Sequence, residues 1–120
     1  MERNEKRMTE AELTICRALA LETGWTELRY NALYDTFFGK SHPAHIGADR
    51  PIPNPFEDCN ATVALMEWGI QQGFVLKCYV FGGGVSCEIG QRIQVERCAT
   101  AQDAITRAIY AAVVLRRNAA

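Results

Sequence analysis

Two histidines, His42 and His45, stand in the sequence Ser-His-Pro-Ala-His at a spacing compatible with two metal ligands. A zinc site takes three or four ligands, and no Cys-x-x-Cys or His-Glu-x-x-His motif accompanies this pair. Asp49 or Cys59 would complete a site only if the loop between them folds back. We therefore expect two solvated histidines without a bound metal. A metal-dependent hydrolase that uses His42 and His45 stays an open alternative.

The five cysteines are the other residues with nucleophilic chemistry. No local Cys-His signature, nucleophile elbow or pair of catalytic carboxylates accompanies them. Cys78 and Cys87 fall in expected strands, where a packed and inert thiol is the usual outcome. The odd count, the irregular spacing and the absence of a signal segment favour reduced thiols in a cytoplasmic protein. We expect no catalytic residues and no cofactor.

Aromatic and basic residues gather in the least regular part of the chain, from Trp25 to Phe56. Aromatic faces stack on nucleobases, and Arg pairs bidentately with phosphates. Loops of this length usually bind something or are disordered, and the aromatics argue against disorder. The alternative is that the tyrosines pack over the edge of the core and the charges are solvated. The residues that we expect to contact a nucleotide-like ligand are Arg29, Tyr30, Tyr34, His45 and Arg50.

Length and charge limit the kinds of protein this chain can be. With 120 residues, 48% of them hydrophobic, the chain has the size of one ordinary domain. We expect a disordered tail over residues 1–7 and a single domain over residues 8–120. The formal charge of -1 provides no global field that would attract nucleic acid or an anionic membrane. No apolar run approaches the ~18 residues that span a bilayer.

Three capping patterns predict three helices. Thr9 and Glu12 form a capping box, and Gly24 is the expected end of that helix. Asp58 is the expected N-cap of a second helix that runs to about Gln72. Thr100 opens the third, with a carboxylate three residues on at its positive end.

The second helix carries two apolar stripes on nearly opposite sides. The first consists of Ala61, Ala64, Leu65 and Trp68, and the second of Val63, Met66 and Ile70. One stripe can face a sheet, so the other needs a partner. That partner is either the first helix of the same chain or a symmetry-related copy. We expect the stripe of Val63, Met66 and Ile70 to form the interface of a homo-oligomer.

The run Phe74 to Phe81 is apolar at both odd and even positions, with Lys77 as its only charge. Successive side chains of a strand point to opposite faces, so both faces of such a strand need to be buried against other elements. We expect this run to be the central strand of a small sheet that lies between helices. Alternating residues over 85–89 and 93–96 predict two further antiparallel strands. The fold class is α+β, a three-layer α/β/α sandwich around a small antiparallel sheet: helix, irregular segment, helix, three-strand meander, helix.

Gly82-Gly83-Gly84 has two interpretations. A glycine-rich loop can cradle a phosphate, but dinucleotide and P-loop signatures place that loop between a strand and a helix. Here a strand is expected to follow. We therefore interpret the three glycines as a hairpin turn that uses positive φ angles.

Two stretches resemble the phage ABA sandwich domain family of small bacteriophage proteins. Ile52-Pro53-Asn54-Pro55-Phe56-Glu57-Asp58 is similar to the segment before that family's central helix, and Cys98 to Ala108 is similar to the start of its C-terminal helix. The family often has Tyr-Ser-Thr-Asp where this chain has Pro-Phe-Glu-Asp. The resemblance implies an α/β/α sandwich encoded by a bacteriophage or prophage. It implies no catalytic residues.

These observations favour a non-enzymatic phage protein in the host cell cytoplasm. Our first hypothesis is an oligomeric anti-defence sponge, which evades host immunity by binding and sequestering a small nucleotide-type immune signal. The second is a protein-interaction module that binds and inhibits a host protein through Val63, Met66 and Ile70. A nucleic-acid binder is disfavoured by the balanced charge.

Overall fold

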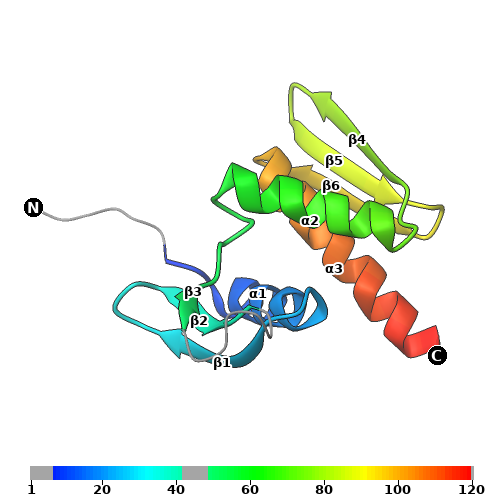
Figure 1. Cartoon of the computed structure of the whole chain (residues 1–120). Coiled ribbons are helices and arrows are strands. Elements are labelled where there is room, and N and C mark those ends of the chain that lie inside the picture. Colours follow the sequence, from blue (N-terminus) through cyan, green and yellow to red (C-terminus); the bar gives the residue numbers. More distant parts are fainter. Residues whose placement is uncertain (1–6, 42–48, 120) are drawn as a thin grey trace, which may run out of the picture. The chain divides into compact units, whose positions relative to one another are not determined.

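The computed structural model describes residues 7–41 and 49–119, which fall into two compact units, Met1–Ile52 and Pro53–Ala120. Within the described residues the chain is α+β, with three helices and two antiparallel three-stranded sheets (Figure 1). The prediction of an α+β fold is confirmed at this level. Each sheet is made by one unit alone, because the first sheet uses strands β1 to β3 and the second uses β4 to β6.

Helix α1 (Glu10–Glu22) begins and ends where its sequence predicts. The Glu12 N–H donates to the Thr9 hydroxyl at 3.1 Å, and the Thr9 N–H donates to the Glu12 carboxylate at 2.9 Å. This reciprocal pair satisfies two backbone donors that the helix itself cannot satisfy. Gly24 follows the helix with a φ of 107°, a conformation that residues with a Cβ rarely adopt.

The segment expected to be irregular contains a small sheet. Strands β1 (Thr26–Asn31), β2 (Thr36–Lys40) and β3 (Arg50–Pro51) pair antiparallel in chain order. The Asn31 side chain accepts hydrogen bonds from the N–H groups of Leu33 and Tyr34, which closes the turn between β1 and β2. The prediction of an irregular segment is therefore wrong where these three strands form.

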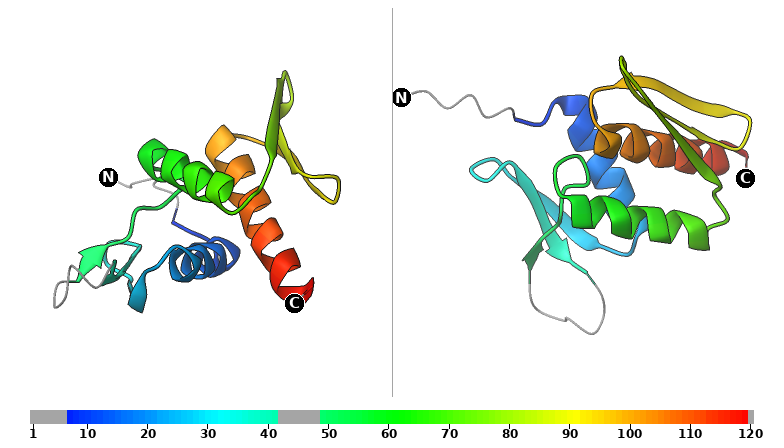
Figure 2. Two further views of the ribbon diagram at one scale, coloured as in Figure 1. Left: turned by 45° about the vertical axis from the view of Figure 1, so that its right-hand side comes forward. Right: turned by 90° about the horizontal axis from the view of Figure 1, so that it is seen from above.

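Helices α2 (Cys59–Gln71) and α3 (Ala101–Ala119) belong to the second unit. The Asp58 carboxylate accepts from the N–H groups of Asn60 and Ala61, and the Thr100 hydroxyl accepts from the Asp103 N–H. Both predicted caps are thus confirmed. Figure 2 shows α3 between α2 and the second sheet, and α3 packs along β5 and β6.

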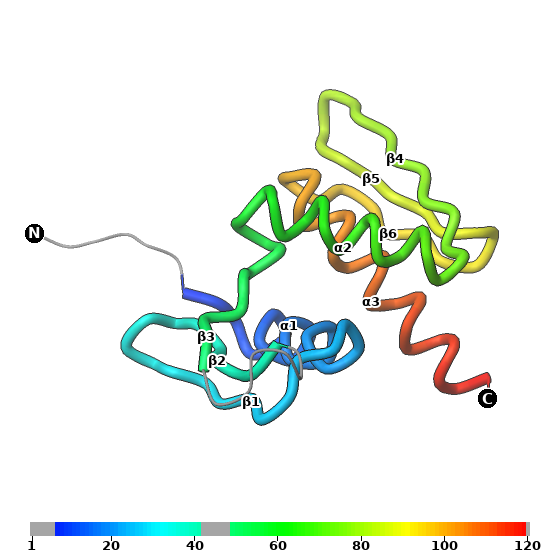
Figure 3. The backbone as a smooth tube through the Cα atoms, viewed as in Figure 1, coloured from blue at the N-terminus to red at the C-terminus, as the bar shows by residue number. Residues whose placement is uncertain are grey.

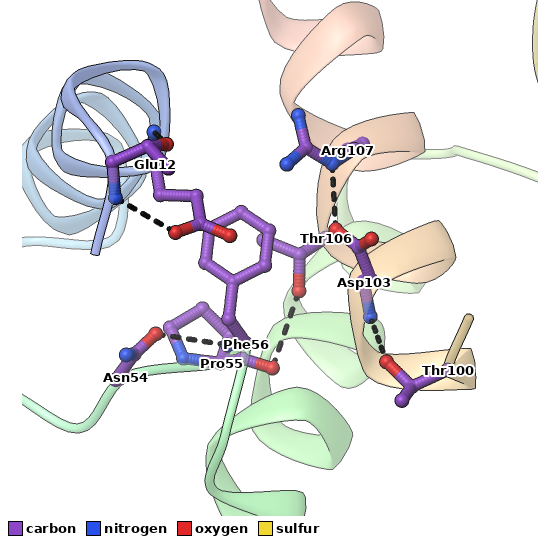
Figure 4. Close-up of polar contacts among 9 residues, drawn as sticks. Glu12, Asn54, Pro55, Phe56, Thr100, Asp103, Thr106 and Arg107 are labelled. Atoms are coloured by element: carbon purple, nitrogen blue, oxygen red, sulfur yellow. Dashed lines mark hydrogen bonds and ion pairs between the residues drawn. The ribbon is translucent and has the colours of Figure 1, made fainter. Parts of the chain in front are cut away.

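A buried polar contact fixes the segment before α2. The Pro55 carbonyl accepts hydrogen bonds from the hydroxyls of Thr62 at 2.8 Å and Thr106 at 3.4 Å, and both threonines are buried. Figure 4 shows the Thr106 hydroxyl directed at this carbonyl. Because a proline lacks an N–H, its carbonyl is the only backbone group that must be satisfied here. The two threonines therefore hold this segment against both helices.

The second sheet contains β4 (Leu76–Phe81), β5 (Gly84–Ile89) and β6 (Ile93–Cys98), in the order β4-β5-β6. The predicted three-strand meander is confirmed, and its path is clear in the backbone tube (Figure 3). The prediction that the run Phe74 to Phe81 is the central strand is wrong, because β4 is an edge strand. Two consecutive hairpins place the middle strand of a meander, β5, at the centre.

The turn between β4 and β5 is a hairpin, as predicted, but its glycines differ in role. Of these three described glycines, Gly84 alone has a φ in the left-handed region, at 139°. A Cβ on Gly84 would lie 2.6 Å from the Cys98 carbonyl oxygen. A glycine is therefore required at position 84, both because of the backbone conformation and because β6 approaches closely. In this turn, Gly84 is thus the glycine that supplies the expected positive φ angle.

Candidate functional site

The outer edge of β4 carries backbone groups that point away from the sheet. The Gly90 N–H donates to the Val75 carbonyl, and β4 pairs with β5 in an unbroken register from Leu76 opposite Ile89 to Phe81 opposite Gly84. Bonded and non-bonded pairs alternate along an antiparallel ladder. The odd-numbered residues of β4 therefore bond to β5, and the N–H and C=O groups of Leu76, Cys78 and Val80 point outward. Among the described strands, none pairs with this edge.

The side chains of β4, and of Val75 just before it, are mostly apolar and exposed. Val75 is 64% exposed and Val80 is 80% exposed, and the rings of Tyr79 and Phe81 are about half exposed. Alternation places Val75, Tyr79 and Phe81 on one face of the sheet and Val80 on the face that α3 covers further along. Lys77 is the only charged residue of the strand. We refer to these four apolar residues and the outward backbone groups as the β4 edge.

The predicted oligomer stripe lies on an exposed side of α2. The buried side of this helix consists of Thr62, Leu65 and Gly69, and a Cβ on Gly69 would lie within 3.7 Å of Ile109 in α3. Val63 and Ile70 are 52% and 68% exposed, and Met66 is half-buried. The three stripe residues therefore share a face that does not pack against α3.

Two of the predicted ligand residues come together in the first unit. The Arg29 guanidinium lies 5.9 Å from the centre of the Phe38 ring, and the Tyr34 ring lies 6.4 Å from the same ring. Arg29 also forms an ion pair with Asp49. Phe38 was not among the predicted ligand residues, although the register of the hairpin places it opposite Arg29. We refer to Arg29, Tyr34 and Phe38 as the Arg29 cluster.

Tyr30 lies on the opposite face of β1 from Arg29, because neighbouring residues of a strand alternate. Its ring packs edge-on against Phe37 at 5.4 Å, and its hydroxyl donates to the Asp35 carboxylate. This hydrogen bond is the main cause that raises the pKa of Tyr30. Burial acts to raise the pKa of Asp35, but hydrogen bonds from Tyr30 and from the Met8 N–H lower it overall.

The other predicted ligand residues are separate from the Arg29 cluster or outside the described residues. Arg50 is exposed on β3, where it stands opposite Gly39. His42 and His45 lie outside the residues that the structure describes. Within residues 7–41 and 49–119, no group of three or more His, Cys, Asp or Glu side chains is arranged to hold a metal ion.

Comparisons of this chain with models of known protein families, with curated proteins and with solved structures find no match. Among the described residues, no helix combines the length and the apolar character needed to cross a bilayer. The chemistry of the chain's own residues is therefore what points to its function, and the β4 edge is its most unusual feature.

Proposed function

We propose that this chain is a non-enzymatic phage protein that binds and inhibits a host protein, with the β4 edge as its binding site. The observation that supports this proposal is an edge strand with outward N–H and C=O groups and exposed apolar side chains on both faces. Such edges are templates for pairing with another chain, and contiguous exposed apolar surface marks interaction sites. The phage origin is supported by the resemblance of the Ile52 to Asp58 and Cys98 to Ala108 stretches.

The proposed binding mode is strand addition. An extended segment of the partner pairs with the outward groups of Leu76, Cys78 and Val80, and its side chains pack beside those of β4. The partner then covers the face that carries Tyr79 and Phe81. In this proposal, the three-layer α/β/α arrangement implied by the family resemblance is completed by the partner.

Selection from a library of random displayed peptides tests this binding mode with the purified protein. Val80→Pro removes an outward N–H and leaves the ladder bonds to β5 intact, since proline is tolerated on the free side of an edge strand. Val80→Thr has nearly the same shape and keeps the N–H. We expect peptides with alternating apolar residues that bind the parent and Val80→Thr but not Val80→Pro. Enriched peptides that bind all three proteins equally would contradict strand addition at this edge.

A second candidate function is the capture of a nucleotide-type immune signal at the Arg29 cluster. Tyr34 is 66% exposed, and its ring lies beside the Phe38 ring, which the Arg29 guanidinium also contacts. A nucleobase can stack on Tyr34, and a phosphate can take the place of Asp49 on Arg29. The protein would then act as a sponge that removes the signal from the host.

Thermal unfolding with a panel of cyclic nucleotides tests this capture. A ligand at 100 times its dissociation constant stabilises the folded state by about 2.7 kcal/mol. We expect stabilisation that Tyr34→Ala abolishes and Asp49→Asn increases, because the asparagine no longer competes with the phosphate for Arg29. If no nucleotide shifts the unfolding temperature of either the parent or Asp49→Asn, the Arg29 cluster does not bind this class of ligand.

A further inference from the structure

Two thiols meet across strands β4 and β5. Cys78 stands directly opposite Cys87 in the ladder, and their sulfur atoms are 2.6 Å apart. Cys78 is exposed, whereas Cys87 is fully buried beneath the sheet's apolar face. Both are present as free thiols in the structure. An exposed thiol and a buried thiol are therefore already in contact with each other.

The backbone at this pair suits a covalent bond between the sulfurs. The bonded pair of Val75 and Gly90 fixes the alternation along the ladder, which makes Cys78 and Cys87 a non-bonded pair. Opposite residues at such positions have Cα atoms about 4.5 Å apart. Disulfides span Cα separations of about 4.4–6.8 Å. The two strands therefore need little movement to accept the bond.

We propose that Cys78 and Cys87 form a reversible cross-strand disulfide when the protein meets a low-molecular-weight disulfide. The Cys78 thiol loses its proton to water, and its thiolate attacks one sulfur of the small disulfide, forms a mixed disulfide and releases one small thiolate. Cys87 then loses its proton to that released thiolate, and its sulfur attacks the Cys78 sulfur and expels the second small thiolate. That thiolate takes a proton from water. The protein loses two hydrogen atoms, and the small disulfide is reduced to two thiols.

Closure of the bond depends on the pKa of the resolving thiol, Cys87. Burial raises the pKa of Cys87 to about 12, and the contact with Cys78 acts in the same direction. The resolving sulfur is therefore mostly protonated at neutral pH, and closure of the bond speeds up as the pH rises. Exposed Cys78 is the sulfur that meets the reagent first. This order of events does not depend on what the β4 edge binds.

The bond would fix the edge strand to the centre of the sheet. Cys78 is one of the three residues with outward backbone groups, so the disulfide links the β4 edge covalently to β5. A reducing cytoplasm returns both thiols, which makes the bond reversible. Its formation therefore couples the rigidity of this edge to the redox state of the surroundings.

Treatment of the full chain with glutathione disulfide, followed by digestion, tests the proposal. Trypsin cuts after Lys77 and Arg92, which leaves both cysteines in one peptide. We expect this peptide to lose the mass of two hydrogen atoms and to resist alkylation. Chymotrypsin cuts after Tyr79 and Phe81, and the two fragments that contain Cys78 and Cys87 should stay joined until a reductant is added.

Variants separate the steps of this reaction. Cys87→Ser should stop at the mixed disulfide on Cys78, and Cys78→Ser should leave Cys87 unmodified. Cys98→Ser and Cys59→Ser should form the bond at the parent's rate. Exposed Cys59 serves as the internal control for reaction with glutathione disulfide. The proposal is overturned if Cys59 has formed a mixed disulfide while both Cys78 and Cys87 of the parent protein can still be alkylated. A bond between Cys87 and Cys98, or bonds only between chains, would overturn it equally.

Discussion

The two edges of the second sheet are built differently. Strand β6 presents Gln94, Glu96 and Arg97 to solvent, and it contains one extra residue relative to β5. Arg97 adopts a φ of 60° at this bulge, and its N–H donates to the Ser86 hydroxyl. Charges and bulges are the devices that protect edge strands from pairing with other chains. Strand β4 keeps a regular register and has a single charge, so its edge is left open.

The cover provided by α3 follows the same division. Helix α3 packs along β5 and β6. Three of the buried residues of α3 are alanines, whose small side chains allow the helix to approach its neighbours closely. Val85, Cys87 and Ile89 of β5 are buried, whereas most of β4 is exposed. The sheet thus has a half that stabilises the fold and a half that is available to a partner.

The largest effect should come from the covered half. Ile109 of α3 is 1% exposed, so Ile109→Ala removes buried apolar contacts and leaves a cavity. We expect the free energy of unfolding of this variant, measured in urea, to be lower than that of the parent by about 2–5 kcal/mol. Val80→Ala on the β4 edge is the matched change and should stay within about 0.5 kcal/mol of the parent. Equal losses for the two variants would mean that β4 is covered in solution.

The hairpin that joins the two halves should be the next most sensitive position. Gly84→Ala places a Cβ against the Cys98 carbonyl and requires a strained φ. The expected loss of unfolding free energy is roughly 1–3 kcal/mol. Gly82→Ala meets no atom within 4 Å and serves as the control, with an expected change of less than about 0.5 kcal/mol. If Gly82→Ala is the more damaging variant, the turn differs from the one described.

The exposed stripe of α2 should affect assembly and leave folding nearly unchanged. If Val63, Met66 and Ile70 contact a second copy, Met66→Asp introduces a charge that must lose its hydration at the interface. Light scattering should then report particles smaller than those of the parent, approaching the 13.4 kDa of one chain. Gln71→Asp adds the same charge beside the stripe and should keep the parent's mass. If light scattering gives the parent protein the mass of a single chain, the proposed interface is refuted.

The smallest effect concerns the polar hairpin end of the first unit, where Asp35 bonds to Tyr30 and to the Met8 N–H. The pKa of Asp35 is lowered in the folded state, so its contribution is present above the ordinary pKa of about 3.9 and is lost as the pH falls through the lowered value. Thermal unfolding of Asp35→Asn should therefore depend less on pH in this acid range than that of the parent. Solvent screening keeps the difference small. Identical profiles would mean that Asp35 makes no such contact.

The helices were predictable because their ends are encoded locally. Thr9, Asp58 and Thr100 each accept a hydrogen bond from a backbone N–H at the start of a helix, and this chemistry is visible in the sequence. The meander was predictable for the same reason, since alternation and glycines mark β5 and β6. These features need no knowledge of tertiary contacts.

The first sheet and the role of β4 were not predictable in this way. Strand β3 has two residues, and β1 is interrupted by a bulge with Glu27 at a φ of 54°, so neither shows a clean alternation. For β4, an apolar pattern on both faces suggested burial within the chain. The same pattern suits an edge strand whose cover comes from a partner, and sequence alone does not distinguish the two cases. The Arg29 cluster depended on a hairpin register that was likewise not visible.

Hydrogen exchange of single backbone amides, measured with and without a peptide selected on the parent protein, tests the central claim most directly. In strand addition, the outward amides of Leu76, Cys78 and Val80 gain a hydrogen-bond partner, so their exchange should slow on binding while that of β6 stays unchanged. Slowed exchange in β6 or in the first unit, with these three amides unaffected, would contradict the account.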